Sequence, residues 1–296
     1  MFKRKAFTMI ELIFVIVIMG IIGKFGIEFL AQAYKSFIFS KINHELHSTS
    51  EQAVEIIAKR LENRIRSSVI ARTAQGAPPV PIASTSGDTY KVLEWVGVDN
   101  EGFRGTTKPL WSGIIDVDSP DANSSVLVSP ETNTSAVSAL IDILSNHDAS
   151  IADAALYFVG ANSNSITDYG WDGNITRINA QQGAMHPITS NGTINQFVSS
   201  TGTDFSGVDV YEYYKLAWSA YAIVYETGSN SKGTLRFYWN YQPWKGENFT
   251  NGNSTILMEN VSTFQFMSVG SIMKIQVCTK SDLVEEYSLC KEKTIF

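Results

Sequence analysis

The sequence predicts an α+β fold: a long N-terminal α-helix, whose first half spans a membrane, packed on an antiparallel β-sheet domain. Three observations support this. Residues 7–30 are nearly all apolar, and apolar residues then recur at three- and four-residue steps as far as Val69. After Pro81, short aromatic and β-branched runs alternate with Gly, Ser, Asn and Asp turns. The predicted parts are a membrane half, 7–30, an amphipathic half, 31–75, and an exterior β-rich domain, 76–296.

The apolar segment 7–30 is about 24 residues long, which is enough to cross a bilayer as a helix at about 1.5 Å per residue. Lys24 and Glu28 interrupt it only near its C-terminal end, where charged side chains can reach the membrane surface. Three cations, Lys3, Arg4 and Lys5, precede the segment. Since positive charge stays on the cytoplasmic side, we expect a cytoplasmic N-terminus and a translocated exterior domain.

The amphipathic half carries an apolar stripe at helical spacing, and charged residues occupy the other faces. We therefore expect one helix from residue 7 to about residue 71, ended by the prolines at 78 and 79. The stripe should cover one face of the sheet. Its members are Ile42, Leu46, Val54, Ile57, Leu61, Ile65 and Val69.

The exterior domain contains eight runs with strand-like composition. Because tight turns separate several of them, we expect antiparallel pairing. A short helix is predicted over 135–145, where four apolar residues share a face, and the polar stretch 160–207 is interpreted as loops. The predicted strands are 90–98, 110–117, 154–159, 213–225, 234–239, 256–261, 264–269 and 272–278.

Glu11 lies inside the otherwise apolar N-terminal segment. A carboxylate at the centre of a membrane helix costs roughly 2.5–3.5 kcal/mol on insertion scales, so it needs a partner or a purpose. Glu11 is therefore a candidate functional residue.

Residues 3–12, with the sequence Lys-Arg-Lys-Ala-Phe-Thr-Met-Ile-Glu-Leu, resemble the processing site of prepilins and pseudopilins, the subunits of type IV pili and type II secretion pseudopili. The resemblance implies that prepilin peptidase removes residues 1–6 by cutting between Ala6 and Phe7, and that Phe7 becomes a methylated N-terminus. The family usually has Gly before the cut, where this chain has Ala6. It also implies that Glu11, the fifth mature residue, pairs with the terminal amine of a neighbouring pilin or pseudopilin in a filament.

The C-terminal region looks like that of large minor pilins, with J-type minor pseudopilins and W-type minor pilins as the nearest comparisons. The segments that carry this likeness are 218–221, 235–239, 243–244 and 257–266, followed by a pair of cysteines. The resemblance implies a pilin-like fold and a place near a filament tip. The protein would reside in the bacterial inner membrane, with a periplasmic exterior domain, before it reaches the filament and cell surface.

Several alternatives remain at this stage. The N-terminal segment could be an uncleaved signal anchor or a removed secretory signal, although a secretory cut site follows the apolar core rather than preceding it. The exterior domain could be a filament-displayed binding module for an exoprotein, DNA or a surface ligand. Its aromatic residues could line such a surface or form a core: Trp218, Tyr221, Trp239, Tyr241 and Trp244.

Composition argues against two other classes of function. With four scattered histidines, no Gly-x-Ser-x-Gly elbow and no phosphate loop, we expect no enzyme activity and no cofactor. The formal charge is −6, and removal of the three leader cations makes it −9. Such an acidic protein should not bind nucleic acid nonspecifically, so a DNA partner is expected only if the filament takes up DNA.

Cys278 and Cys290 are the two cysteines of a chain that carries an export signal. In an oxidising compartment they should form a disulfide, closing a loop of about 13 residues. Free thiols or a metal-binding pair are the alternatives.

Two weaker patterns lie in the exterior domain. Asp116, Asp118 and Asp121 offer oxygen ligands for calcium, although they lack a helix-loop-helix ligand pattern and an acidic turn is the simpler interpretation. Three asparagines resemble acceptors of bacterial N-glycosylation, because each has an acid two residues before it and Ser or Thr two residues after it: Asn123, Asn133 and Asn174. In an Asn-rich chain this pattern can also arise by coincidence.

Overall fold

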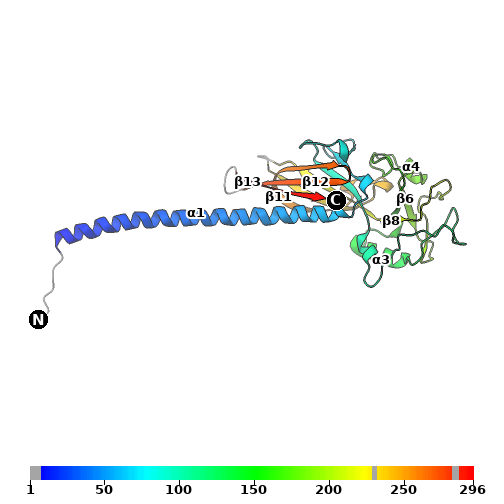
Figure 1. Cartoon of the computed structure of the whole chain (residues 1–296), viewed down its shortest axis with the longest axis horizontal. Coiled ribbons are helices and arrows are strands. Elements are labelled where there is room, and N and C mark those ends of the chain that lie inside the picture. The colour runs from blue at the N-terminus through cyan, green and yellow to red at the C-terminus, as the bar shows by residue number, and fades with distance from the viewer. Residues whose placement is uncertain (1–7, 229–231, 282–286) are drawn as a thin grey trace.

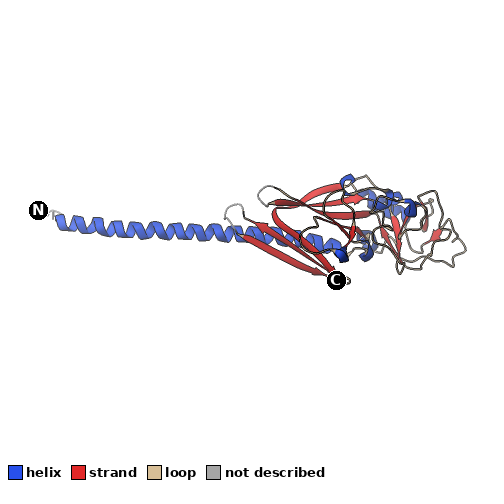
Figure 2. Ribbon diagram, turned by 90° about the horizontal axis from the view of Figure 1, so that it is seen from above, coloured by secondary structure: helices blue, strands red, loops and turns tan. Residues whose placement is uncertain are grey.

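The computed structural model describes residues 8–228, 232–281 and 287–296. Figure 1 shows a long helix that projects from one end of a globular part containing all the described strands. The helix, α1, extends over Met9–Glu62. Its N-terminal half projects away from the globular part, and its C-terminal half lies along a sheet (Figure 2). The predicted α+β class and the long apolar helix are therefore confirmed.

The helix ends earlier than predicted. Asn63 is its C-cap residue, Arg66–Ser68 form a 3₁₀ turn and Ile70–Arg72 form strand β1, so the expectation of helix to about residue 71 is wrong. The reason is pairing with another part of the chain. The Ile65 N–H donates to the Val96 carbonyl at 2.9 Å, and tertiary hydrogen bonds of this kind override local helix preference.

The larger sheet has eight strands in the order β13-β12-β11-β10-β9-β3-β1-β2, and all of its pairings are antiparallel. Strands β9 to β13 lie next to one another in chain order, because short connections join consecutive antiparallel strands. The strands are β1 Ile70–Arg72, β2 Val80–Pro81, β3 Val92–Gly97, β9 Ser219–Glu226, β10 Gly233–Tyr241, β11 Asn253–Val269, β12 Ile272–Lys280 and β13 Ser288–Ile295.

A second antiparallel sheet of five strands lies beyond the end of α1, in the order β4-β7-β6-β5-β8. Its strands are β4 Leu127–Val128, β5 Ala155–Phe158, β6 Met185–Thr189, β7 Gln196–Ser199 and β8 Tyr214–Ala217. Three helices accompany it: α2 Asn100–Arg104, α3 Thr134–Leu144 and α4 Thr176–Asn179. Short 3₁₀ turns occupy Ile82–Ser84, Ile151–Asp153, Pro243–Lys245 and Phe249–Asn251.

The predicted stripe of α1 forms one side of the main core. Ile57 and Leu61 have no exposed surface and pack with Leu235 and Phe264 of the larger sheet, among other residues. Complete burial of one such side chain is worth about 1.5–3 kcal/mol, so a few of them suffice to hold the helix on the sheet. Leu46 is only partly buried.

The strand predictions succeeded unevenly. Strands occupy most of seven predicted runs, with 213–225 divided into β8 and β9 and the runs 256–261 and 264–269 joined in β11. The run 110–117 forms no strand, because Gly113 has a positive φ and Trp111 turns into the core. The interpretation of 160–207 as loops is wrong over β6 and β7, and β13 was not predicted. The predicted helix 135–145 is α3.

Candidate functional site

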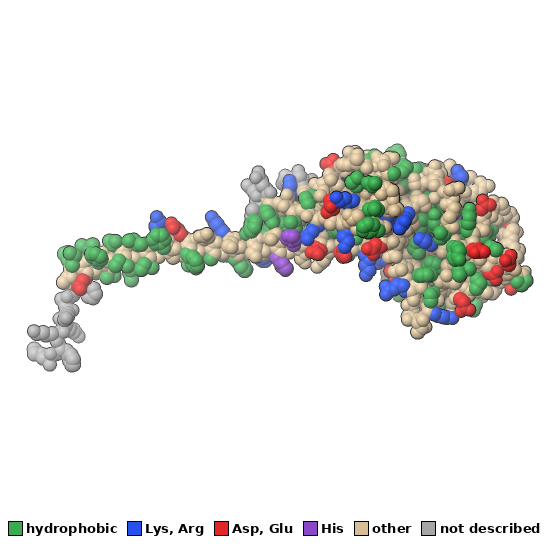
Figure 3. Space-filling model, viewed as in Figure 1, with side chains coloured by type: hydrophobic (Ala, Val, Ile, Leu, Met, Phe, Trp, Pro, Cys, Tyr) green, Lys and Arg blue, Asp and Glu red, His purple; other side chains and the backbone are tan. Residues whose placement is uncertain are grey.

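The N-terminal part of α1 is the most unusual surface of the molecule. Every described residue up to Phe37 is exposed, and one 18-residue window of α1 has a mean hydropathy of 2.4 with no burial. Figure 3 shows this half of the helix covered with hydrophobic side chains. The exposed part is about 44 Å long at about 1.5 Å per residue, similar to the full thickness of a bilayer. This helix is therefore long and apolar enough to span a membrane.

Glu11 lies in the first turn of α1, where it forms a capping box with Thr8. Its Oε2 accepts hydrogen bonds from the Thr8 N–H at 2.9 Å and the Thr8 hydroxyl at 2.8 Å, while the Glu11 N–H donates to Thr8 Oγ1 at 3.4 Å. Sequence reasoning missed this partner, although Thr-x-x-Glu before an apolar run is a known helix-start signal. Ala6 and Phe7, the predicted cleavage site, lie outside the described residues.

Charged residues inside the apolar part of α1 are few. Lys24 and Glu28, one helical turn apart, approach within 3.9 Å, and both side chains are largely exposed. An isolated exposed pair of this kind contributes less than about 1 kcal/mol. The pair lets the two charges of this apolar segment partly neutralise each other.

Strand β13 fastens α1 to the globular part. The Tyr287 hydroxyl, just before the strand, donates to Asn43 Oδ1 at 2.7 Å. Farther along the strand, Lys293 lies 2.8 Å from the Glu55 carboxylate, so polar contacts join one face of α1 to alternate residues of β13. The buried Ile295 adds an apolar contact at the end of the strand.

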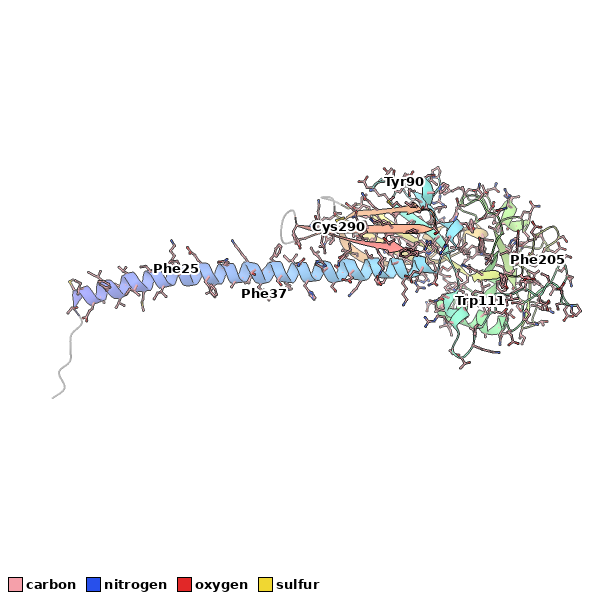
Figure 4. All side chains as sticks on the ribbon, in the orientation of Figure 1. Phe25, Phe37, Tyr90, Trp111, Phe205 and Cys290 are labelled. Atoms are coloured by element: carbon pink, nitrogen blue, oxygen red, sulfur yellow. A yellow bond between two sulfur atoms is a disulfide. The ribbon has the colours of Figure 1, made fainter. Side chains whose placement is uncertain are left out.

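Cys278 and Cys290 form a disulfide, which confirms the prediction. They are directly opposite partners in the antiparallel pair of β12 and β13, and Figure 4 labels Cys290 above α1. The disulfide therefore links β13, the strand that contacts α1, to the neighbouring strand β12. It thereby reinforces one of the contacts through which α1 is held on the sheet.

The weaker candidates are all in turns or at a helix end. Asp116 Oδ1 accepts the N–H of Asp118 at 3.2 Å, and within the described residues no group of three or more His, Cys, Asp or Glu side chains is arranged to hold a metal. Asp121 lies in the same acidic turn, which is exposed.

The three asparagines of the glycosylation pattern are exposed. Asn133 is the N-cap of α3, since its Oδ1 accepts the Ala136 N–H at 3.0 Å. The Asn123 side chain holds a tight turn. Asn174 Oδ1 accepts the hydroxyl of Thr176 at 2.8 Å, so all three side chains already have local hydrogen bonds.

The candidate aromatic surface is mostly core. Trp218, Tyr221, Tyr241 and Trp244 are buried, and Trp239 is half-buried. Tyr241 takes part in a buried polar cluster that sequence reasoning missed: its hydroxyl donates to Glu94 at 3.0 Å. Arg72 Nε donates to the same carboxylate at 2.6 Å. Burial raises the pKa of Glu94, and the positive charge of Arg72 opposes that rise.

Asp99 is a second buried acid that the sequence did not reveal. It is 2% exposed and caps α2, where its Oδ1 accepts the Gly102 N–H at 3.0 Å. Its Oδ2 accepts Trp111 Nε1 at 3.0 Å. Burial raises the pKa of Asp99 to about 6, because desolvation outweighs the two hydrogen bonds that favour the charged form.

Comparison of the chain with protein-family models, curated proteins and solved structures finds no match. Within the described residues, fold and surface together define an α+β protein with one exposed apolar helix of membrane-spanning length and a globular part that contains a disulfide-closed hairpin.

Proposed function

We propose that the protein is a minor pilin or pseudopilin, a structural subunit of a type IV pilus or a type II secretion pseudopilus. In this proposal prepilin peptidase cuts between Ala6 and Phe7, and the mature chain rests in the inner membrane with its exterior domain in the periplasm. The subunit then enters a filament through α1, near the tip. The observation that carries the proposal is a carboxylate, Glu11, at the start of a helix whose N-terminal half is apolar and fully exposed.

The geometry of Glu11 supports an intermolecular role. In the described residues both of its hydrogen bonds from Thr8 end on Oε2, and Oε1 accepts none. A carboxylate has acceptor sites on each oxygen, so Oε1 remains free for the terminal amine of a neighbouring subunit. Inside a bundle of apolar helices, every such polar group must be paired within the assembly.

The size of the exterior domain supports a minor role. Two sheets and their connections form a broad body at the end of one helix (Figure 1). Repeating that bulk along a thin shaft would space the helices apart, whereas a subunit at the tip has room on one side. Fastening of α1 by β13 and the disulfide suits a subunit through which assembly force passes.

The test compares two variants in a bacterium that assembles the filament. Glu11→Ala should reduce the protein in sheared filaments by roughly 100-fold or more, because removing one member of a buried pair costs about 3–5 kcal/mol. Thr8→Ala is the matched control. It removes only the helix cap, worth about 1 kcal/mol, and should reduce incorporation no more than about fivefold.

Equal losses in the two variants would mean that Glu11 acts only as a cap, and unchanged incorporation of Glu11→Ala would refute the pairing. The mass of the N-terminal peptide from native filaments supplies a second readout. It should correspond to a methylated chain that begins at Phe7, and retention of Met1 in cells with active prepilin peptidase would contradict the proposal.

A second candidate function is a filament-displayed binding module for an exoprotein, DNA or a surface ligand. The observation that favours it is an exposed apolar groove on the exterior domain, where Ile114 and Tyr213 are 45% and 59% exposed.

A further inference from the structure

A groove with a volume of about 590 Å³ opens beside the C-terminal end of α1. Its apolar walls come from parts of the chain that are distant in sequence. Phe103 belongs to α2, Trp111 and Ile114 to the following loop, Val159 follows β5 and Tyr213 precedes β8. Phe103, Ile114 and Val159 are each close to 45% exposed. Large apolar side chains that gather on a surface mark binding sites more often than scattered ones do.

The groove is rigid on the side of α2. Asp99 caps that helix and also holds the Trp111 indole through its Nε1. The Phe103 and Trp111 rings lie 4.8 Å apart, and Trp111 packs in turn on the buried Tyr214 at 5.6 Å. In Figure 4, Trp111 lies in the globular part just beyond the end of α1. A preformed wall of this kind lowers the entropic cost of binding.

Cations that form no ion pair within the described residues contribute to the groove lining. Arg64 and Lys215 line it. Arg64 is 4% exposed, and its guanidinium donates to two neutral acceptors, the Leu61 carbonyl at 2.7 Å and the Ser271 carbonyl at 2.8 Å. Exposed Arg66 is close enough that its charge lowers the pKa of both Arg64 and Lys215, adding to the effect of burial.

This cluster differs from three cations on or beside α1 that do have acidic partners. Within the described ranges, Arg64, Arg66 and Lys215 form no ion pair with a carboxylate, whereas Arg60, Lys291 and Lys293 each do. Glu62 also reaches the groove rim, but its side chain is exposed to water. In a chain with a net charge of −6, three neighbouring cations without such partners are a local exception.

We propose that this groove binds a peptide segment of a partner protein in which apolar side chains stand next to carboxylates. The apolar side chains would contact Phe103, Ile114 and Val159, and the carboxylates would supply the missing ion pairs at Lys215 and Arg66. Charge complementarity of this kind directs partner choice and orientation.

A peptide fits better than a nucleic acid. The acidic net charge of the chain repels a nucleic acid, which carries one phosphate per nucleotide, more strongly than a short peptide with two carboxylates. Beside the aromatic rings, Val98, Ile114 and Val159 offer aliphatic contacts that suit apolar side chains. The proposal rests on the second candidate function, a displayed binding module, and is independent of filament assembly.

The experiment uses the full chain in detergent micelles and fluorescence anisotropy of labelled probes. One hexapeptide carries four apolar residues followed by two glutamates, a second carries two glutamines in their place, and a third carries two lysines. A twelve-nucleotide oligo-dT is the nucleic-acid probe. The acidic peptide should bind at least roughly tenfold more tightly than the glutamine peptide, and the lysine peptide should bind most weakly.

The variants Lys215→Glu and Arg66→Glu should each weaken binding of the acidic peptide by roughly tenfold. Each should leave binding of the glutamine peptide unchanged. The matched control is Lys274→Glu, a charge reversal on β12 that breaks the exposed pair with Glu292. It should not affect binding. Equal affinity for the three peptides, no binding of the acidic peptide at about 1 mM, or tighter binding of oligo-dT would each overturn the proposal. Because anisotropy reports no assembly, its failure leaves the Glu11 test standing.

Discussion

The titration of Asp99 tests whether burial or hydrogen bonding has the larger effect on the pKa of a buried carboxyl group. The carboxylate is 2% exposed and accepts one hydrogen bond on each oxygen, from the Gly102 N–H and from Trp111 Nε1. Burial disfavours its charged form and the two donors favour it. The structure indicates that burial prevails, with a pKa raised from 3.8 to about 6.

The size and sign of the effect follow from linkage. A folded pKa of about 6 against 3.8 in the unfolded chain corresponds to about 3 kcal/mol. Because the folded protein takes up the proton first on acidification, Asp99 contributes most stability below pH 3.8. That contribution is lost as pH rises through 6, where both states are ionised.

The assay is urea unfolding of the full chain in detergent, followed by tryptophan fluorescence at several pH values between 4 and 7.5, for wild type and Asp99→Asn. Since the variant cannot titrate at this position, the stability of wild type relative to the variant should increase by about 2 kcal/mol from pH 7 to pH 4, the rest of the gain lying at lower pH. Asp148→Asn controls for the loss of one surface negative charge. A difference that is constant with pH, or a wild type that loses relative stability on acidification, would refute the dominance of burial.

Two further predictions concern stability. Replacing Cys278 and Cys290 together with serine should lower the free energy of unfolding by about 3 kcal/mol, measured by urea titration, and should speed hydrogen exchange in β13; unchanged exchange there would contradict the fastening role. Arg72→Met should cost about 3–5 kcal/mol in the same titration, because it leaves Glu94 buried without its cation, and Arg72→Met combined with Glu94→Met should recover most of that loss. A double variant as unstable as the single one would show that the pair itself carries net stability.

The spacing of apolar residues predicted α1 and the face that it buries, but it did not predict where the helix ends. Ile57 and Leu61 are helical, whereas Ile65 and Val69 continue the same four-residue spacing outside the helix. All four are buried, so the pattern records burial and not backbone geometry. Only the pairing of residue 65 with β3 decides the boundary, and that pairing is a tertiary event that no local window contains.

The candidate functional residues also include some that the sequence reveals and others that only the tertiary structure brings together. Glu11 and the cysteine pair stand out in the sequence because their chemistry conflicts with an apolar segment or requires a partner. The cysteine pair could also have predicted β13. Cys278 lies in a predicted strand, and a disulfide to Cys290 is compatible with a neighbouring antiparallel strand. The groove could not be predicted, because two sheets and the end of α1 bring its walls together from residues 62–215.

In the proposed filament assembly, the two oxygens of Glu11 would explain how one carboxylate remains in a membrane before assembly and then promotes it. An unpaired carboxylate in lipid is costly, yet Oε2 already receives two hydrogen bonds from Thr8 within the same helix turn. The cap therefore lowers the cost of holding the monomer in the bilayer. Because Oε1 accepts no hydrogen bond among the described residues, part of the desolvation cost would remain until the amine of the proposed neighbour arrives. That residual cost favours association in one register, because a neighbour displaced by a single helix turn would bring its amine about 5 Å from the acceptor.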